Sequence, residues 1–169
     1  LDRVDLLGTL GYPVLISNYD THYRLASFLF RHTEKPIGIA MGVPTLREIF
    51  EEKYYSKLAG GILEAFGRLF KNDLKLYVYP LLEKESSNKI TVGNLKVSKR
   101  LRHLYAFLKE NRNIVDIEKY NEDYLSILSR DVLKRIRKGD SGWEKSLPPK
   151  VAQKIKRKKL FGYNPKNNF

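Results

Sequence analysis

The feature that most constrains the fold is an alternation of short apolar runs with longer stretches of helical periodicity. Three runs are typical of buried strands: Pro13 to Ser17, Ile37 to Met41 and Leu74 to Tyr79. Helical spacing of apolar residues marks the intervening segments Thr21 to Arg31 and Gly61 to Phe70. Such alternation predicts an α/β fold with a mainly parallel sheet, covered by helices in three layers and joined by right-handed crossovers.

The C-terminal region adds two helices whose ends are marked in the sequence. Ser129 is a good N-cap for the first helix, and Gly139 stands where a glycine stop belongs. Pro149 opens the second helix at the position that proline favours. The stretch from Ile127 to Tyr163 contains twelve Lys or Arg and three Asp or Glu, and so carries +9 of the chain's net charge of +13. We therefore expect an anionic partner.

The start of the first basic helix is a candidate phosphate site. The first backbone N–H groups of a helix lack intrahelical partners, and the helix dipole favours negative charge there. Ser129 and Arg130 lie at this point, and the Arg130 guanidinium can reach over the free N–H groups to bind phosphate through two hydrogen bonds. An ordinary capped and solvated helix would show the same pattern.

The spacing of this stretch resembles the C-terminal signature of bacterial nicotinate mononucleotide adenylyltransferases, which runs approximately I-S-S-T-x-I-R-x-R-I-x-x-G, then P-x-x-V-x-x-Y-I, then L-Y. The residues in register are Ile127, Ser129, Val132, Arg135, Ile136 and Gly139, followed by Pro148 or Pro149, Val151, Ile155, Leu160 and Phe161. The match departs at Leu128, Arg130 and Leu133, which replace a Ser, a Thr and a triphosphate-binding Arg.

From Val4 to Tyr163 the chain also resembles the C-terminal part of a larger bacterial family described as nicotinate-nucleotide adenylyltransferase-like. The resemblance implies one Rossmann-like nucleotidyltransferase domain over residues 1–169, as a fragment of a longer protein with an upstream domain. It also implies ATP with Mg²⁺ as cofactor and a place in NAD biosynthesis. The family's upstream G-x-F-x-P-x-H segment is absent from this sequence. We therefore expect nucleotide binding without adenylyl transfer by this fragment, and assign no catalytic residue.

Two further positions are candidate ligand contacts. Ser17 and Asn18 follow the first predicted strand and Gly42 follows the second. Ligands of open parallel sheets bind at the carboxyl ends of strands. Turn chemistry alone also favours Asn and Gly at such places, so both interpretations stay open.

Two other classes of function remain. A nucleic-acid-binding module is indicated by the pI near 9.8 and by the run KIKRKK from Lys154 to Lys159, close to Trp143 and Phe161. A protein-interaction domain with a solvated basic face would have the same charge. Trp143 could stack on a base or pin its linker to the core. Nucleotide binding should depend on Ser129 and Arg130, and nucleic-acid binding on the basic run.

Composition narrows the chemistry. The chain has no Cys and three scattered His, so we expect neither disulfides nor a metal site. We find no signal peptide and no apolar run long enough for a membrane span, and therefore expect a cytoplasmic protein without a membrane partner.

Overall fold

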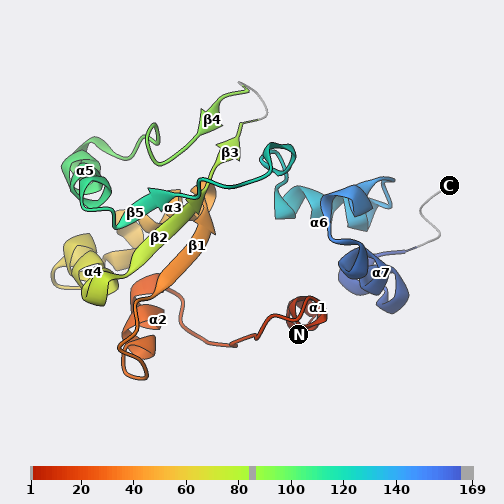
Figure 1. Cartoon of the computed structure of the whole chain (residues 1–169), viewed down its shortest axis with the longest axis horizontal. Coiled ribbons are helices and arrows are strands. Elements are labelled where there is room, and N and C mark those ends of the chain that lie inside the picture. Colours follow the sequence, from red (N-terminus) through yellow and green to blue (C-terminus); the bar gives the residue numbers. More distant parts are fainter. Residues whose placement is uncertain (1, 84–86, 165–169) are drawn as a thin grey trace. The chain divides into compact units, whose positions relative to one another are not determined.

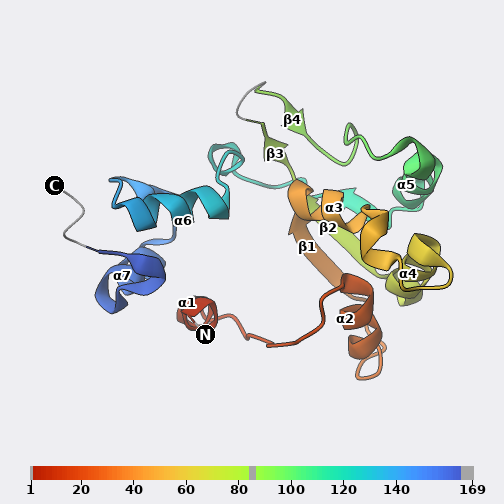
Figure 2. The same cartoon turned by 180° about the vertical axis from the view of Figure 1, so that it is seen from behind.

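The computed structural model describes residues 2–83 and 87–164, and the chain forms two compact units (Figures 1 and 2). We call Ser17–Leu125 the sheet unit, and Leu1–Ile16 together with Ser126–Phe169 the basic helical unit. The two units have distinct sets of buried residues. The contacts group the residues into these two units, and one domain over residues 1–169 stays a prediction.

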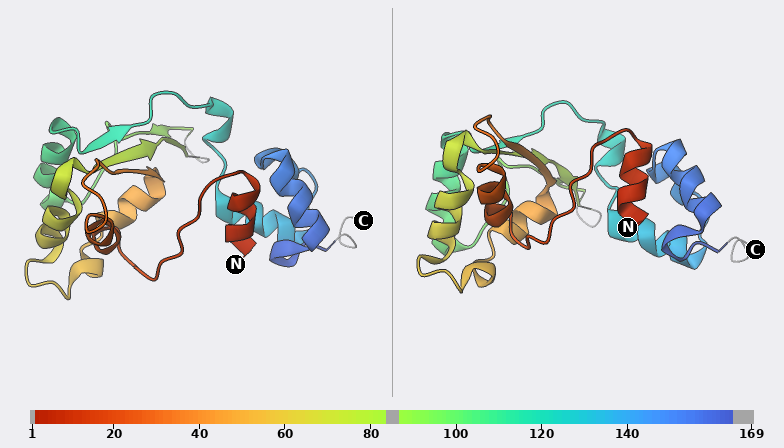
Figure 3. Two further views of the ribbon diagram at one scale, coloured as in Figure 1. Left: turned by 60° about the horizontal axis from the view of Figure 1, so that its bottom comes forward. Right: turned by 90° about the horizontal axis from the view of Figure 1, so that it is seen from below.

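The sheet unit is mixed α/β and contains a small parallel sheet. Its strands β1 (Gly38–Gly42), β2 (Lys75–Tyr79) and β5 (Ile114–Asp116) lie side by side in the order β1-β2-β5 (Figure 3). The predicted strands at Ile37–Met41 and Leu74–Tyr79 and their parallel pairing are therefore confirmed. The three-layer, Rossmann-like arrangement stays a prediction.

Helices α2 (His22–Leu29), α3 (Val43–Ile49), α4 (Gly61–Leu69) and α5 (Arg102–Glu110) complete this unit, with a short antiparallel pair of β3 (Leu81–Leu82) and β4 (Lys89–Ile90). Four 3-10 turns connect them: η1 (Glu52–Tyr55), η2 (Lys71–Asp73), η3 (Lys99–Leu101) and η4 (Glu122–Tyr124). Side chains alternate along the strands, as the pleat requires. Met41 and Val78 are buried, whereas Ala40 and Tyr77 are exposed on the opposite face.

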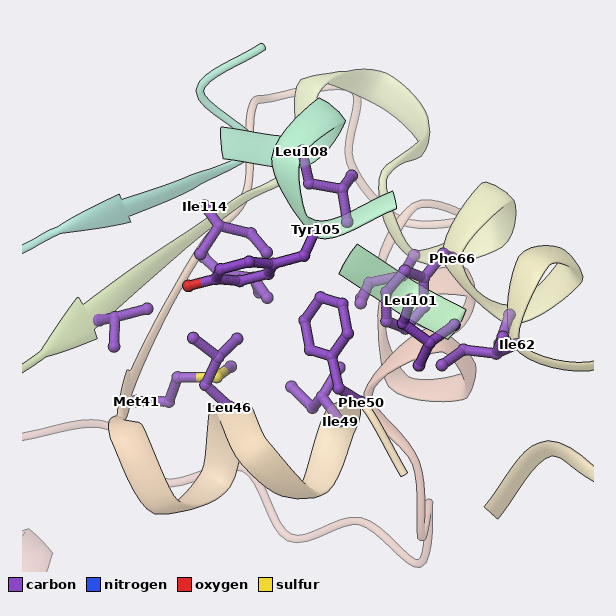
Figure 4. Packing of buried hydrophobic residues seen from close by; sticks show 14 of the residues in the cluster. Met41, Leu46, Ile49, Phe50, Ile62, Phe66, Leu101, Tyr105, Leu108 and Ile114 are labelled. Atoms are coloured by element: carbon purple, nitrogen blue, oxygen red, sulfur yellow. The ribbon is translucent and has the colours of Figure 1, made fainter. Parts of the chain in front are cut away.

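Aromatic contacts organise the core of the sheet unit (Figure 4). The ring of Phe50 packs edge to face against the rings of Phe66 and Tyr105. Its centroid lies 5.0 Å from that of Phe66 and 5.1 Å from that of Tyr105. The buried hydroxyl of Tyr105 donates a hydrogen bond to the carbonyl oxygen of Val92 at 2.7 Å. The core thus combines the preferred aromatic geometry with a satisfied buried polar group.

The predicted strand from Pro13 to Ser17 is wrong. Residues 12–20 have no regular secondary structure, and the side chains of Leu15 and Ile16 are 64% and 67% exposed. Three consecutive apolar residues fit the pattern of a buried strand, but a strand also needs neighbours for its backbone N–H and C=O groups. The sheet ends at β1 and β5, so this segment is not among its strands.

The basic helical unit contains α1 (Asp2–Thr9), α6 (Ser129–Lys138) and α7 (Pro149–Lys158), with the turns η5 (Trp143–Ser146) and η6 (Leu160–Gly162). The two predicted C-terminal helices are confirmed. Gly139 ends α6 with a φ of 74°, and Pro149 is the first residue of α7. Trp143 is only 1% exposed and packs edge to face against Tyr163, so it pins the linker between α6 and α7 to the core.

Lys154 ties the N-terminal helix of this unit to α7. Its Nζ donates hydrogen bonds to the carbonyl oxygen of Asp5 at 2.6 Å and to Thr9 Oγ1 at 2.7 Å. Residues far apart in the sequence therefore form one helical unit.

Candidate anion-binding site

The start of α6 differs by one residue from the sequence prediction. Leu128 is the N-cap, with φ −108° and ψ 125°, and Ser129 is the first helical residue. The backbone N–H groups of Asp131 and Val132 both donate to the Leu128 carbonyl oxygen. In the described chain no side chain caps this helix start. The prediction of Ser129 as N-cap is therefore wrong, but Ser129 and Arg130 do occupy the first turn, where helices attract anions.

A pocket of about 540 Å³ lies beside this helix start, entirely within the basic helical unit. Its volume and largely apolar lining are typical of sites for small organic ligands. The lining residues are Arg3, Leu6, Ile127, Ser129, Arg130, Val132, Leu133, Ile136, Leu147, Val151, Ile155 and Phe161.

The polar groups of the pocket lie at its rim. Arg3 comes from α1, Ser129 and Arg130 come from the first turn of α6, and all three side chains are exposed. Leu133 is half-buried and forms part of the apolar wall. Two guanidinium groups beside an apolar cavity can hold a ligand that has an anionic end and a flat apolar body.

The other predicted contacts belong to the sheet unit. Gly42 ends β1, pairs in register with Tyr79 and is the N-cap of α3, so it does lie at the carboxyl edge of the sheet. Ser17 and Asn18 are exposed in a segment without regular structure. Among residues 2–16 the structure has no strand, so the prediction that Ser17 and Asn18 follow a strand of the sheet is wrong.

Three of the five cations in the run from Lys154 to Lys159 have partners inside the basic helical unit. Lys154 binds α1 as described, Lys158 Nζ lies 3.2 Å from the Asp5 carboxylate, and Lys156 forms an ion pair with Glu144. The hydrogen bond from Lys158 lowers the pKa of Asp5, and that from Lys156 lowers the pKa of Glu144. These three lysines are therefore occupied with partners inside the unit.

Arg3 is the pocket residue that the sequence did not indicate. It lies on α1, more than a hundred residues before Arg130, and it matches no motif. Arg3 is brought to the pocket by the packing of α1 on α7, in which Lys154 and Lys158 bind Asp5. No local pattern could have shown it.

Comparison with known proteins finds no matching family model, curated protein or solved structure. Within residues 2–83 and 87–164, no group of three His, Cys, Asp or Glu side chains is placed to hold a metal ion. None of the helices described is long and apolar enough to cross a membrane.

Proposed function

We propose that this chain is a nucleotide-binding, adenylyltransferase-like domain that binds a mononucleotide in the pocket beside α6. The observation that carries the proposal is that Ser129 and Arg130, at the first turn of α6, line the same apolar pocket of about 540 Å³ as Arg3. A nucleotide combines a flat, largely apolar base with an anionic phosphate, which are the two properties that the pocket accommodates.

In the proposed complex the phosphate lies at the rim and the base lies inside. The backbone N–H groups and dipole of α6 favour the phosphate, and Arg130 can bind it through two hydrogen bonds. Leu133, which stands where the resembled family has a triphosphate-binding Arg, contacts the base instead. Arg130 thereby supplies the cation that Leu133 cannot.

Adenylyl transfer by this chain is not part of the proposal. The resembled family uses its signature Thr and Arg to stabilise charge at the phosphates, and Arg130 and Leu133 stand at those positions. Loss of one positioned donor costs about 2.7–4 kcal/mol in comparable sites. We expect no dinucleotide from ATP and a pyridine mononucleotide, and turnover that Ser129→Ala abolishes would contradict this. The Rossmann-like fold and the use of ATP with Mg²⁺ rest on the same resemblance.

Calorimetric titration with AMP, ATP and inorganic phosphate tests the proposal. We expect AMP and ATP to bind, and Arg130→Ala to weaken both by about tenfold or more, because a hydrogen bond to a charged group contributes about 1.5–3 kcal/mol. The matched control is Arg157→Ala, which removes an exposed cation of α7.

A second variant distinguishes binding of the base in the pocket from binding of phosphate at the start of α6. Leu133→Trp fills the apolar cavity while leaving Ser129 and Arg130 in place, so it should abolish AMP binding and spare inorganic phosphate. The proposal is rejected if none of the three ligands binds at millimolar concentration, or if Arg130→Ala changes no affinity.

A further inference from the structure

The outer face of α6 carries a line of exposed cations. Four basic residues recur at intervals that place them on one side of the helix, while Val132 and Ile136 on the other side are buried in the core. We call these four residues the α6 stripe: Arg130, Lys134, Arg137 and Lys138. At 1.5 Å per residue the stripe is about 12 Å long.

The α6 stripe differs from the basic run of α7 in how its charges are used. In the part of the chain that the structure describes, none of the four stripe side chains has a hydrogen-bond or ion-pair partner, whereas Lys154, Lys156 and Lys158 each have at least one. Four unpaired cations in a line repel one another, and a polyanion that lies along them would remove that repulsion.

We propose that the α6 stripe binds the phosphates of a single-stranded nucleic acid, one base of which enters the pocket beside α6. Arg130 belongs both to the stripe and to the pocket rim, so a strand whose base is in the pocket meets cations along the helix. For the base, the inference rests on the proposed function. The ligand is then a polynucleotide whose backbone follows the α6 stripe.

The geometry favours a single strand over a duplex or a membrane. Proteins that bind single strands combine a positively charged track for the backbone with sites for unstacked bases, whereas the bases of a duplex are paired and stacked. A helix that binds in a membrane interface inserts an apolar face, but the apolar residues Val132 and Ile136 of α6 are buried within the unit.

Fluorescence anisotropy with a labelled single-stranded oligoadenylate of about ten nucleotides, within the usual site sizes, tests the inference. We expect the oligonucleotide to bind at least about tenfold more tightly than AMP at low salt. The stripe variant Lys134→Gln/Arg137→Gln/Lys138→Gln should lose this gain while its affinity for AMP stays unchanged, because Arg130 is intact. Its slope of log affinity against log salt should fall by about 2, since each contacted phosphate of a single strand contributes about 0.7.

The matched control is Lys150→Gln/Arg157→Gln/Lys159→Gln, which removes the same charge from exposed cations of α7 and of its C-cap, Lys159. An equal loss in the control would overturn the inference, because the binding would then follow net charge. Equal binding of a duplex or of vesicles of anionic phospholipid would also overturn it. If AMP binds and the affinity for the oligonucleotide is no higher, the inference fails while the proposed mononucleotide site is retained. If AMP does not bind but the oligonucleotide binds and depends on the stripe residues, phosphate binding by the α6 stripe is supported and mononucleotide binding in the pocket is rejected.

Discussion

The sheet unit balances most of its charge internally, whereas the basic helical unit does not. Residues 17–125 contain 18 Lys or Arg and 14 Asp or Glu, a net charge of +4, and ion pairs such as Arg47–Glu83 and Lys89–Glu122 join distant parts of this unit. Residues 1–16 and 126–169 contain 14 basic and 5 acidic residues, a net charge of +9. A fold that retains such an excess of one sign is suited to an anionic ligand.

The two units also differ in the size of their cores. The core of the sheet unit combines a sheet, four helices and a cluster of aromatic rings. The core of the basic helical unit contains far fewer buried residues, of which Trp143 is the largest. Since small units bury a smaller fraction of their surface, we expect the basic helical unit to be the less stable of the two.

The largest expected effect separates the two cores. Phe66→Ala removes a buried ring from the sheet unit and should cost about 3–5 kcal/mol of its free energy of unfolding. Trp143 is the only tryptophan of the chain, so its fluorescence reports on the basic helical unit alone. In urea, the transition measured by far-UV circular dichroism should move to lower concentration, while the fluorescence transition stays in place.

Phe107→Ala serves as the control, because this ring is 58% exposed and its loss should change stability by less than about 0.5 kcal/mol. An equal shift of both transitions in Phe66→Ala would mean that the two units unfold together.

A medium effect should appear only in the basic helical unit. Lys154→Met removes the donor that binds the Asp5 carbonyl oxygen and Thr9 Oγ1. These hydrogen bonds lie in exposed and partly buried surroundings, so their loss should cost about 1 kcal/mol and shift the fluorescence transition to lower urea concentration. Lys150→Met, at an exposed position of the same helix, is the matched control. Equal effects of both changes would show that lost charge, rather than the lost hydrogen bonds, is responsible.

The smallest expected effect is a difference in acid sensitivity. Burial lowers the pKa of His22 in the sheet unit below its ordinary value of 6.5, partly opposed by Glu48. The unfolded state then binds the proton first, so the sheet unit loses stability as pH falls below 6.5 towards the folded pKa. The pKa values of Asp5 and Glu144 are lowered from 3.8 and 4.5 by their lysine partners. Their contribution is present above those values and is lost only as pH falls through the lower folded pKa values.

Urea midpoints measured between about pH 7 and pH 5.5 should therefore fall for circular dichroism and remain constant for Trp143 fluorescence. His22→Gln should remove the pH dependence of the urea midpoint measured by circular dichroism. A fluorescence midpoint that falls in the same range would contradict the assignment.

Local sequence patterns were sufficient to predict the features that depend on neighbouring residues. Gly139 ends α6 because glycine adopts a positive φ at little cost, and Pro149 starts α7 because its own φ is already helical. The apolar runs at Ile37–Met41 and Leu74–Tyr79 are long enough to form strands. The excess of cations in the C-terminal region was likewise evident from composition.

Contacts between distant residues depend on tertiary packing and could not be predicted from local patterns. The segment from Pro13 to Ser17 has the pattern of a strand but lies outside the sheet, because pairing depends on distant backbone groups. Lys154 looked like part of a nucleic-acid-binding run, yet it holds α1 against α7. Arg3 joins Arg130 at the pocket because the packing of α1 brings together residues from the two ends of the chain. Local sequence rules carry no information about such long-range contacts, and it is these contacts that form the pocket and leave the α6 stripe free.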